Sequence, residues 1–378
     1  MGEVSPLSTS LWFPVGRIVP AADLVGREEF LQEILARIRA GEGVVISAPR
    51  RTGKTSLTLE ALRRLRSEGW LVAHVDLLRS PNEAQLAEQL LDAVLENETG
   101  VRRTLSKLRQ LTSHIAGKLE LKAQTKEGLE LALAYAATPP DLEAALEAGN
   151  NLAERTNRTI CIAFDEFQRA PQLRPDAYAF IRSVLQHHQR AVYMFLGSQG
   201  TLLEQQFTRV GSPFWNFAVV RALPQVRPAS WAAYLQRKFT EFGHPIDHVI
   251  AEEMAARSGG HPHCTMVLAN QFLLALFSRR DLPQHLLLAA AYDAALDDLG
   301  ATYDELYRSL AARSLAQETV LRLAREQPPY AAKADPTAVR RALQHLINQG
   351  IIRRRAKGSF DFCEAMFQAY LLRETDGP

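Results

Sequence analysis

The segment that most restricts the fold of this chain is 43–57, which reads GVVISAPRRTGKTSL. Its β-branched start, Val44–Ser47, is typical of a buried strand, and the leucines of 56–67 recur with the period of an amphipathic helix. Between the strand and the helix lies a Gly-Lys-Thr tripeptide. A strand, a short loop and a helix in this order predict an α/β fold in which backbone N–H groups at a helix N-terminus hold an anion.

The loop departs from the phosphate-binding pattern GxxxxGK[ST] at its first position, where Ala48 replaces glycine. Alanine adds one methyl group and is excluded there only if the backbone φ angle is positive. Lys54 can neutralise the β- and γ-phosphates of a nucleotide, and the hydroxyl of Thr55 can bind Mg²⁺. We therefore expect a nucleotide to be held by the following residues: Pro49, Arg50, Arg51, Thr52, Gly53, Lys54, Thr55 and Ser56.

Further apolar segments, separated by helical patterns, predict the rest of a parallel sheet covered on both faces. They lie at 70–76, 160–164, 192–197 and 217–223. The second of these ends in Asp165 and Glu166, which places two carboxylates at the sheet edge where ligands bind in open α/β folds. Asp165 is the expected second ligand of Mg²⁺, and Glu166 is the expected base that orients and deprotonates the attacking water. A helix cap is the alternative interpretation of this pair.

The strand at 192–197 is followed by two polar residues, Ser198 and Gln199. A strand end at this sheet edge can place a hydroxyl beside the γ-phosphate and the attacking water. We therefore expect Ser198 to sense the γ-phosphate during catalysis. A plain strand-to-helix turn is the alternative interpretation.

After Pro224 only helical patterns follow, at 231–242, 249–258 and 262–277. A smaller unit begins near residue 302, where two further helical patterns are followed by two strand-like segments. A helix, a turn, a second helix and a hairpin form the order of a winged helix. We therefore predict three parts: a P-loop core at 1–223 with a helical insertion at about 80–158, a helical lid at 224–300, and a winged-helix domain at 301–378.

Together these residues resemble the archaeal-type AAA ATPase family, a relative of the STAND switch NTPases and of the AAA+ replication initiators. The matching stretches are 25-VGREEFL-31, 48-APRRTGKTSL-57, 164-FDEFQ-168, 196-LGSQG-200 and 258-SGGHPHC-264. Because a strand separates the two nucleotide motifs and an acid follows the aspartate, the fold looks like the additional-strand, AAA+-like branch of P-loop NTPases. The resemblance implies ATP or ADP and Mg²⁺ as ligands, and ATP hydrolysis as the activity.

The resemblance also implies roles for residues outside the loop. Val25, Gly26 and Arg27 would lie near the adenine, and the turn with His261 and Pro262 would close the lid over the nucleotide. The family tends to carry an arginine soon after the strand that precedes Ser198, and 212–223 has none at that place. The nearby substitutes are Arg209 and Arg221. Slow or partner-dependent hydrolysis is expected if neither reaches a phosphate.

The C-terminal unit is the candidate surface for duplex DNA, because the second helix of a winged helix enters the major groove and the wing meets phosphates. The residues expected to contact DNA are Arg340, Arg341, Gln344, Arg353, Arg354, Arg355 and Lys357. The alternative is a winged helix that packs on the core and regulates it. A basic stretch in the insertion, VRRTLSKLRQLTSHIAGKLELK, is a second candidate for a DNA or partner contact, with a solvated helix face as its alternative.

The remaining composition sets limits on function. A net charge of +2 confines any nucleic-acid surface to a local patch. Cys161, Cys264 and Cys363 lack metal-ligand spacing, which predicts reduced, structural cysteines. The N-terminus lacks the pattern of a signal peptide, and the longest apolar tract is too short to span a bilayer, so we expect a cytoplasmic protein without a membrane partner.

Three functions therefore remain open. A DNA-associated motor or loader, for replication, transposition or defence, predicts DNA-stimulated hydrolysis and nucleotide-dependent homo-oligomers. A STAND-like signalling switch predicts retained ADP, slow hydrolysis and a protein partner. A transcription regulator that uses the α/β domain as a scaffold predicts DNA binding independent of nucleotide. Glu166 argues against the third function, and the missing arginine keeps the second one open.

Overall fold

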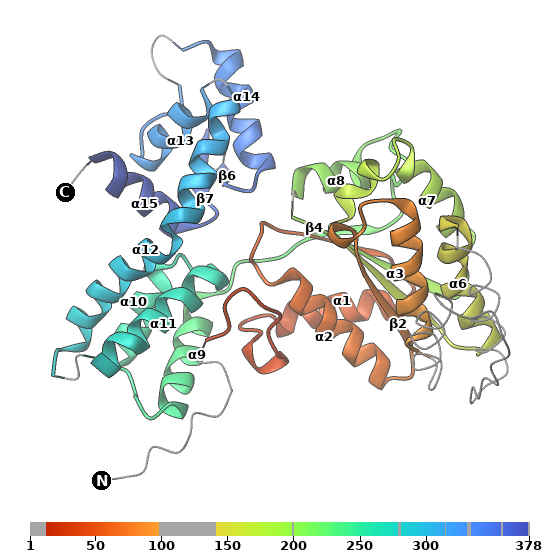
Figure 1. The fold of residues 1–378 in the computed structure, drawn as a ribbon, viewed down its shortest axis with the longest axis horizontal. Helices are drawn as coiled ribbons and strands as arrows, with labels where there is room; N and C mark the ends of the chain where they lie inside the picture. Colours follow the sequence, from red (N-terminus) through yellow and green to blue (C-terminus); the bar gives the residue numbers. More distant parts are fainter. Residues whose placement is uncertain are drawn as a thin grey trace, which may run out of the picture. The chain divides into compact units, whose positions relative to one another are not determined.

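The computed structural model describes residues 13–97, 141–198, 200–278, 281–313, 315–330, 334–356 and 358–376. The chain forms two compact units, which are coloured by sequence in Figure 1. The sheet unit consists of Phe30–Ser47 and Leu57–Leu223, and the helical unit consists of Met1–Glu29, Ala48–Ser56 and Pro224–Pro378. The predicted basic stretch of the insertion, Gln199 and Lys357 lie outside the described residues.

The sheet unit contains five parallel strands in the order β2-β3-β4-β1-β5. They are β1 (Val44–Ser47), β2 (Leu71–Asp76), β3 (Ile160–Asp165), β4 (Ala191–Gly197) and β5 (Val219–Ala222). Each one lies where a short apolar run predicted a strand. Because β4 lies between β1 and β3, the predicted additional-strand order is confirmed.

Helices cover both faces of this sheet. Successive side chains of a strand point to opposite faces, so each strand contributes to both layers. Cys161 and Ala163 of β3 face α1 (Glu28–Arg39) and α2 (Lys54–Ser67). Ile160, Ile162 and Phe164 face the other layer of helices. That layer consists of α3 (Glu83–Leu95), α6 (Leu142–Arg155), α7 (Ala177–Leu185) and α8 (Gly200–Thr208). Burial on both sides explains why the strands are apolar along their whole length.

The helical unit has one continuous hydrophobic core. Its helices are α9 (Pro228–Glu241), α10 (His248–Arg257), α11 (Pro262–Ser278), α12 (Gln284–Ser309), α13 (Ala316–Ala324), α14 (Pro336–Asn348) and α15 (Ala365–Asp376). The N-terminal segment joins this core through Phe13, whose ring packs against those of Phe239 and Phe242. The side-chain amide of Asn270 bonds both the N–H and the C=O of Phe13, at 3.1 and 2.9 Å.

The structure divides the chain differently from the sequence prediction. The expected boundary at 300/301 falls inside α12, and the buried residues Leu299 and Tyr303 on its two sides belong to the same core. The N-terminal segment, expected with the P-loop core, packs in the helical unit because Phe13 is anchored there. Hydrophobic periodicity identifies each helix but carries no information about which helices share a core, so it placed these boundaries wrongly.

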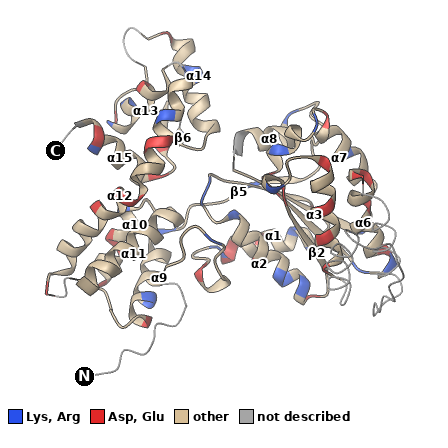
Figure 2. Cartoon of the chain, viewed as in Figure 1, with Lys and Arg blue, Asp and Glu red and all other residues tan. Residues whose placement is uncertain are grey.

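The C-terminal elements follow the predicted order of helix, helix and hairpin. The antiparallel strands β6 (Ile352–Ala356) and β7 (Ser359–Phe362) follow α14, with Arg353 beside Asp361. The helix α14 begins after Asp335, whose carboxylate accepts from the backbone N–H groups of Thr337 and Ala338. Figure 2 shows basic and acidic segments interspersed in both units. None of the described helices combines the length and the apolar composition that crossing a bilayer requires.

Candidate nucleotide-binding site

The phosphate loop follows β1 directly and ends where α2 begins, at Lys54. Ala48 is buried and its φ angle is not positive, so a methyl group is tolerated in place of the usual glycine. The Lys54 ammonium donates to the carbonyl oxygens of Ala48, at 2.9 Å, and Pro49, at 2.7 Å. The Thr52 hydroxyl donates to the Pro49 carbonyl, at 2.8 Å. These bonds fold the loop around a cation at a helix N-terminus, the arrangement that an anion requires.

Arg27 holds the phosphate loop from the side of the N-terminal segment. Its side chain is buried, and its guanidinium donates to the carbonyl oxygens of Thr52, at 3.2 Å, and of Pro224. Burial lowers the pKa of Arg27 to about 10, so the guanidinium stays charged at neutral pH. Arg27, which was predicted to lie near the nucleotide, therefore contacts the backbone of the phosphate loop directly.

Gly26 and Val25, the other residues expected near the adenine, pack against the start of α9. Gly26 has a φ angle of +62°, and a Cβ atom there would lie 3.0 Å from Cγ1 of Val226. Val25 is partly buried against the helical core. The position of the segment at 25–26 is thus fixed by the packing of Val25 and by the left-handed backbone of Gly26.

The predicted lid turn reaches the same loop. His261 is buried just before α11, which begins at Pro262, and its Nε2 lies 3.4 Å from the carbonyl oxygen of Arg50. Nη1 of Arg51 lies 3.4 Å from Nε2 of His263. Burial, with a smaller effect of the Arg51 charge, lowers the pKa of His263 to about 4, so a neutral imidazole accepts from the guanidinium. The structure therefore brings the loop together with the predicted lid residue His261 and with His263, which was not predicted.

In the sheet unit, the predicted acidic pair lies at the end of β3. Asp165 is 3% exposed, and Nε2 of His74 in β2 lies 3.6 Å from its Oδ2 atom. Glu166 has a left-handed backbone with φ 52°, and its N–H donates to Oδ1 of Asp165, at 2.9 Å. A left-handed residue other than glycine costs about 1–3 kcal/mol, and such strain concentrates at functional sites.

The carboxylate of Glu166 accepts two hydrogen bonds on Oε2. Ser198 Oγ donates one, at 2.8 Å, and Gln168 Nε2 donates the other. Ser198 is buried, and Gly197 before it leaves the space that the Gln168 side chain occupies. The structure thus brings two predicted residues, Glu166 and Ser198, into contact and adds Gln168 to them. Gln168 ends the matching stretch 164-FDEFQ-168, but the sequence pattern assigned it no role in the site.

Asp76 is a second residue that the sequence reasoning missed. It ends β2 and is the register partner of Asp165. Burial raises the pKa of Asp76, and the negative charges of Asp165 and Glu166 raise it further. The sequence could have indicated Asp76, because this residue ends an apolar strand as Asp165 does. Carboxylate oxygens such as these are the hard ligands that fit Mg²⁺, as is the hydroxyl of Thr55 in the loop.

The two candidate arginines have different surroundings. Arg209 is exposed at the C-terminal end of α8. Arg221 in β5 donates to Oε2 of Glu33 in α1, at 2.8 Å, and this bond holds the pKa of Glu33 below its usual value. An arginine engaged by a carboxylate must break that bond before it contacts a phosphate.

The residues expected to contact DNA are exposed wherever they are described. Arg340, Arg341 and Gln344 lie on α14 among buried residues that include Val339 and Leu343. On the hairpin, Arg353 bonds Gln225 at 2.9 Å and pairs with Asp361 at 3.4 Å. Arg354 lies over the ring of Phe360, and Arg355 lies 4.0 Å from Asp361.

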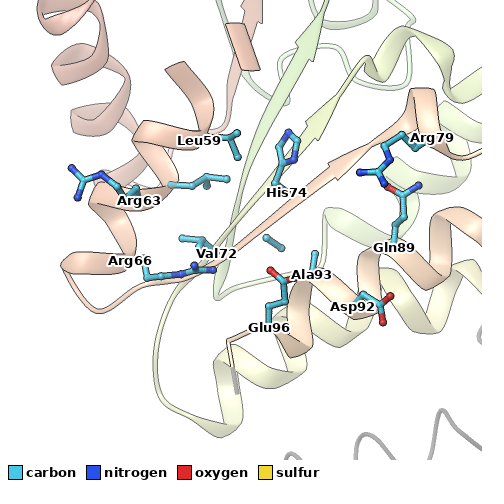
Figure 3. Close-up of a pocket in the computed structure, with 12 residues that line it drawn as sticks. Leu59, Arg63, Arg66, Val72, His74, Arg79, Gln89, Asp92, Ala93 and Glu96 are labelled. Atoms are coloured by element: carbon cyan, nitrogen blue, oxygen red, sulfur yellow. The ribbon is translucent and has the colours of Figure 1, made fainter. Parts of the chain in front are cut away.

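A groove of about 520 Å³ lies beside the edge strand β2 (Figure 3). In this view the labelled side chains come from α2, from β2 and the short helical turn after it, and from α3 and the residue that follows it, with Arg63 and Arg79 on opposite sides of His74. None of the predicted nucleotide-binding residues lines the groove. The groove is therefore not the nucleotide site.

Comparison with known proteins agrees with this geometry. Residues 23–196 match the family model of the AAA ATPase domain. The fold is similar to that of the Walker-type ATPase of Pyrococcus abyssi, with a TM-score of 0.69 and 15% identity over 96% of this chain and 99% of that chain. It is also similar to the ORC2 protein of Aeropyrum pernix in its ADPNP-ADP complexes, with a TM-score of 0.56 and 14% identity over 98% of each chain. No curated protein matches the sequence. The resemblance predicted from the motifs is confirmed for residues 23–196, which match the AAA ATPase domain.

Proposed function

We propose that Lys54, Thr55 and Asp165 bind Mg-ATP and that Glu166 activates the water that attacks the γ-phosphate. The observation that carries this proposal is that three neighbouring strands end at one edge of the sheet. β1 ends directly before the phosphate loop, β3 ends at Asp165, and β4 ends directly before Ser198. Adjacent strand ends at the carboxyl edge of an α/β sheet are where such folds bind ligands.

Each residue would have a separate task. Lys54 would neutralise charge on the phosphates, and Thr55 and Asp165 would hold the Mg²⁺ ion. That ion, when bound, supplies further charge neutralisation. Glu166 would accept the proton of the water while Ser198 holds its carboxylate in place. Arg209, exposed directly after α8, is the candidate for the arginine that stabilises the transition state.

Equilibrium binding of a fluorescent ATP analogue tests the loop. In Lys54→Ala we expect affinity to fall about tenfold or more, because a hydrogen bond to a charged group contributes about 1.5–3 kcal/mol. The control is Arg66→Ala, which removes an exposed positive charge from the other end of α2 and should leave affinity unchanged. Wild-type affinity in Lys54→Ala would contradict the proposal.

We also propose that the helical unit couples the nucleotide state to duplex DNA, with α14 as the recognition helix and β6 and β7 as the wing of a winged helix. The exposed Arg340, Arg341 and Gln344 support this role for α14. Packing supports the coupling, because a Cβ on Gly259 in the lid turn would lie 2.8 Å from Cβ of Ala365 in α15. A movement of the lid would therefore carry the C-terminal elements with it.

DNA binding and DNA-stimulated hydrolysis test this second proposal. The double variant Arg340→Ala/Arg341→Ala should bind duplex DNA more weakly, and its log–log salt slope should be smaller by about 0.9 for each phosphate that the removed arginines neutralise in the wild type. Arg308→Ala, an exposed arginine on α12, is the matched control. Equal binding by the wild type and the double variant would exclude α14 as the DNA-binding helix.

A STAND-like switch that binds a protein partner is the second candidate, and the bond between Arg221 and Glu33 favours it. An arginine held away from the phosphates would leave hydrolysis slow. This function predicts ADP retained through purification and a hydrolysis rate that DNA does not change. Rapid turnover with DNA stimulation would rule it out.

A further inference from the structure

Three side chains that commonly bind metal ions converge inside the helical unit: His261, Cys264 and Glu364. One donor atom of each lies within 4.8 Å of the donor atoms of the other two. His261 directly precedes α11 and Cys264 lies in the first turn of that helix, and the backbone N–H of Thr265 bonds the C=O of His261, at 2.9 Å. A spacing of three residues at a helix start places the two side chains on one side of it. Glu364 directly precedes α15. We propose that this group, the His-Cys-Glu cluster, binds one Zn²⁺ ion.

The two ring nitrogens of His261 have different surroundings, as they do in a metal-binding histidine. Nε2 lies 3.4 Å from the carbonyl oxygen of Arg50, whereas Nδ1 is buried and has no hydrogen-bond partner. The residue as a whole is 4% exposed, so water has little access to that nitrogen. Histidines that bind metals almost always donate their other N–H to a carbonyl or a carboxylate. The geometry therefore assigns Nδ1 to the metal and Nε2–H to Arg50.

The thiol and the carboxylate of the cluster already lie in contact. Sγ of Cys264 is 3.5 Å from Oε2 of Glu364 and 3.6 Å from the Tyr303 hydroxyl. The Tyr303 hydroxyl donates to the same Oε2, at 3.0 Å. A hydrogen bond of this kind orients a carboxylate that binds a metal. Tyr303 is thus placed outside the ligand set, where it fixes one of the ligands.

Charge and donor type select the ion. Across the described ranges, no lysine or arginine forms an ion pair with Glu364. A dication bound by one thiolate and one carboxylate gives a site with no net charge, which lowers the cost of burial. Sulfur, nitrogen and oxygen donors together suit Zn²⁺, whereas Mg²⁺ and Ca²⁺ take oxygen ligands. Three protein ligands leave the fourth tetrahedral position to water.

The ion would join three segments that are far apart in the sequence: the phosphate loop through Arg50, the start of α11, and the start of α15. The spacing of the cysteines could not reveal this site, because only one cysteine takes part. Its partners are a histidine three residues away and a glutamate 100 residues away.

Titration of untagged, metal-free protein with Co²⁺, a spectroscopic substitute for Zn²⁺, tests the proposal. We expect one equivalent to bind, a thiolate-to-cobalt charge-transfer absorption to appear, and Zn²⁺ to displace it. Cys264→Ser should abolish this absorption, while Cys363→Ser, the cysteine next to Glu364 in the sequence, should retain it. Glu364→Gln and His261→Gln should each weaken Zn²⁺ binding about tenfold or more.

Stability measurements separate loss of the ligand from loss of the fold. Equimolar Zn²⁺ should raise the unfolding midpoint of the wild type and of Cys363→Ser, because the ion binds only the folded chain. It should leave Cys264→Ser unchanged, and circular dichroism reports whether that variant is folded. The proposal is overturned if the wild type shows no thiolate absorption at equimolar Co²⁺, or if the absorption persists in Cys264→Ser.

Discussion

The hydroxyl of Ser198 donates a hydrogen bond to Oε2 of Glu166, at 2.8 Å. This bond connects the residue after β4 to the residue after β3, two strands that are neighbours in the sheet. A general base works only while its carboxylate points at the water, so a buried donor that fixes the carboxylate is a positioning group. The sensing role expected of Ser198 therefore includes the orientation of Glu166.

Replacement of Ser198 by alanine removes that donor and leaves Gln168 as the described partner of the carboxylate. We expect kcat for ATP to fall by about 10- to 100-fold, because a small misplacement of a reacting group has costs of this size. KM should change much less, since the phosphate loop is untouched. Ser183→Ala on α7, an exposed serine, is the control. Steady-state kinetics with wild-type kcat in Ser198→Ala would argue against the positioning role.

Gly26→Ala should destabilise the helical unit more than a left-handed backbone alone explains. The backbone conformation costs about 1–2 kcal/mol for a residue other than glycine, and crowding against Val226 adds about 1–3 kcal/mol. Gly243→Ala supplies the matched control, because Gly243 also has a positive φ, +78°, but no atom within 4 Å of an added Cβ. Urea unfolding of the two variants measures the difference. Equal losses of unfolding free energy would show that Val226 does not constrain this position.

The stability of the sheet unit should depend on the charge of His188. Its side chain is 1% exposed, and burial lowers its pKa below the usual 6.5, although Glu147 opposes this effect. As the pH falls below 6.5, the unfolded chain takes up a proton that the native imidazole does not, so native stability decreases. His188→Gln should therefore lose less stability than the wild type between neutral pH and about pH 5.

Urea unfolding at the two pH values checks this expectation. His187→Gln, the exposed neighbour, should follow the wild type. If His188→Gln and the wild type lose equal free energies of unfolding, proton uptake by His188 is not linked to folding.

Local sequence patterns predicted the sheet well, for physical reasons. Strands buried on both faces, such as Ile160–Asp165, must be apolar along their length, and the carboxyl ends of parallel strands share an edge. The acidic pair could therefore be placed at that edge without knowledge of any contact. The loop was predictable because a phosphate cradle needs glycine, lysine and a hydroxyl in sequence.

Contacts between distant segments could not be predicted in the same way. The guanidinium of Arg27 binds the carbonyl of Thr52, and the thiol of Cys264 contacts the carboxylate of Glu364. Both contacts depend on how segments that are distant in the sequence pack together. A period of 3.6 residues reveals the buried face of a helix but not its neighbour. The division of the chain was misplaced for the same reason, since α12 continues through residue 300 within one core.

The most direct test of the account is ATP hydrolysis by Glu166→Gln, measured together with nucleotide binding. The amide keeps the size of the side chain but cannot accept the proton of the attacking water. We predict a fall in kcat of about 10²-fold or more, with affinity for an ATP analogue close to that of the wild type. Glu143→Gln, an exposed glutamate on α6, should behave as the wild type. Hydrolysis by Glu166→Gln at the wild-type rate would contradict the assignment of Glu166 as the base.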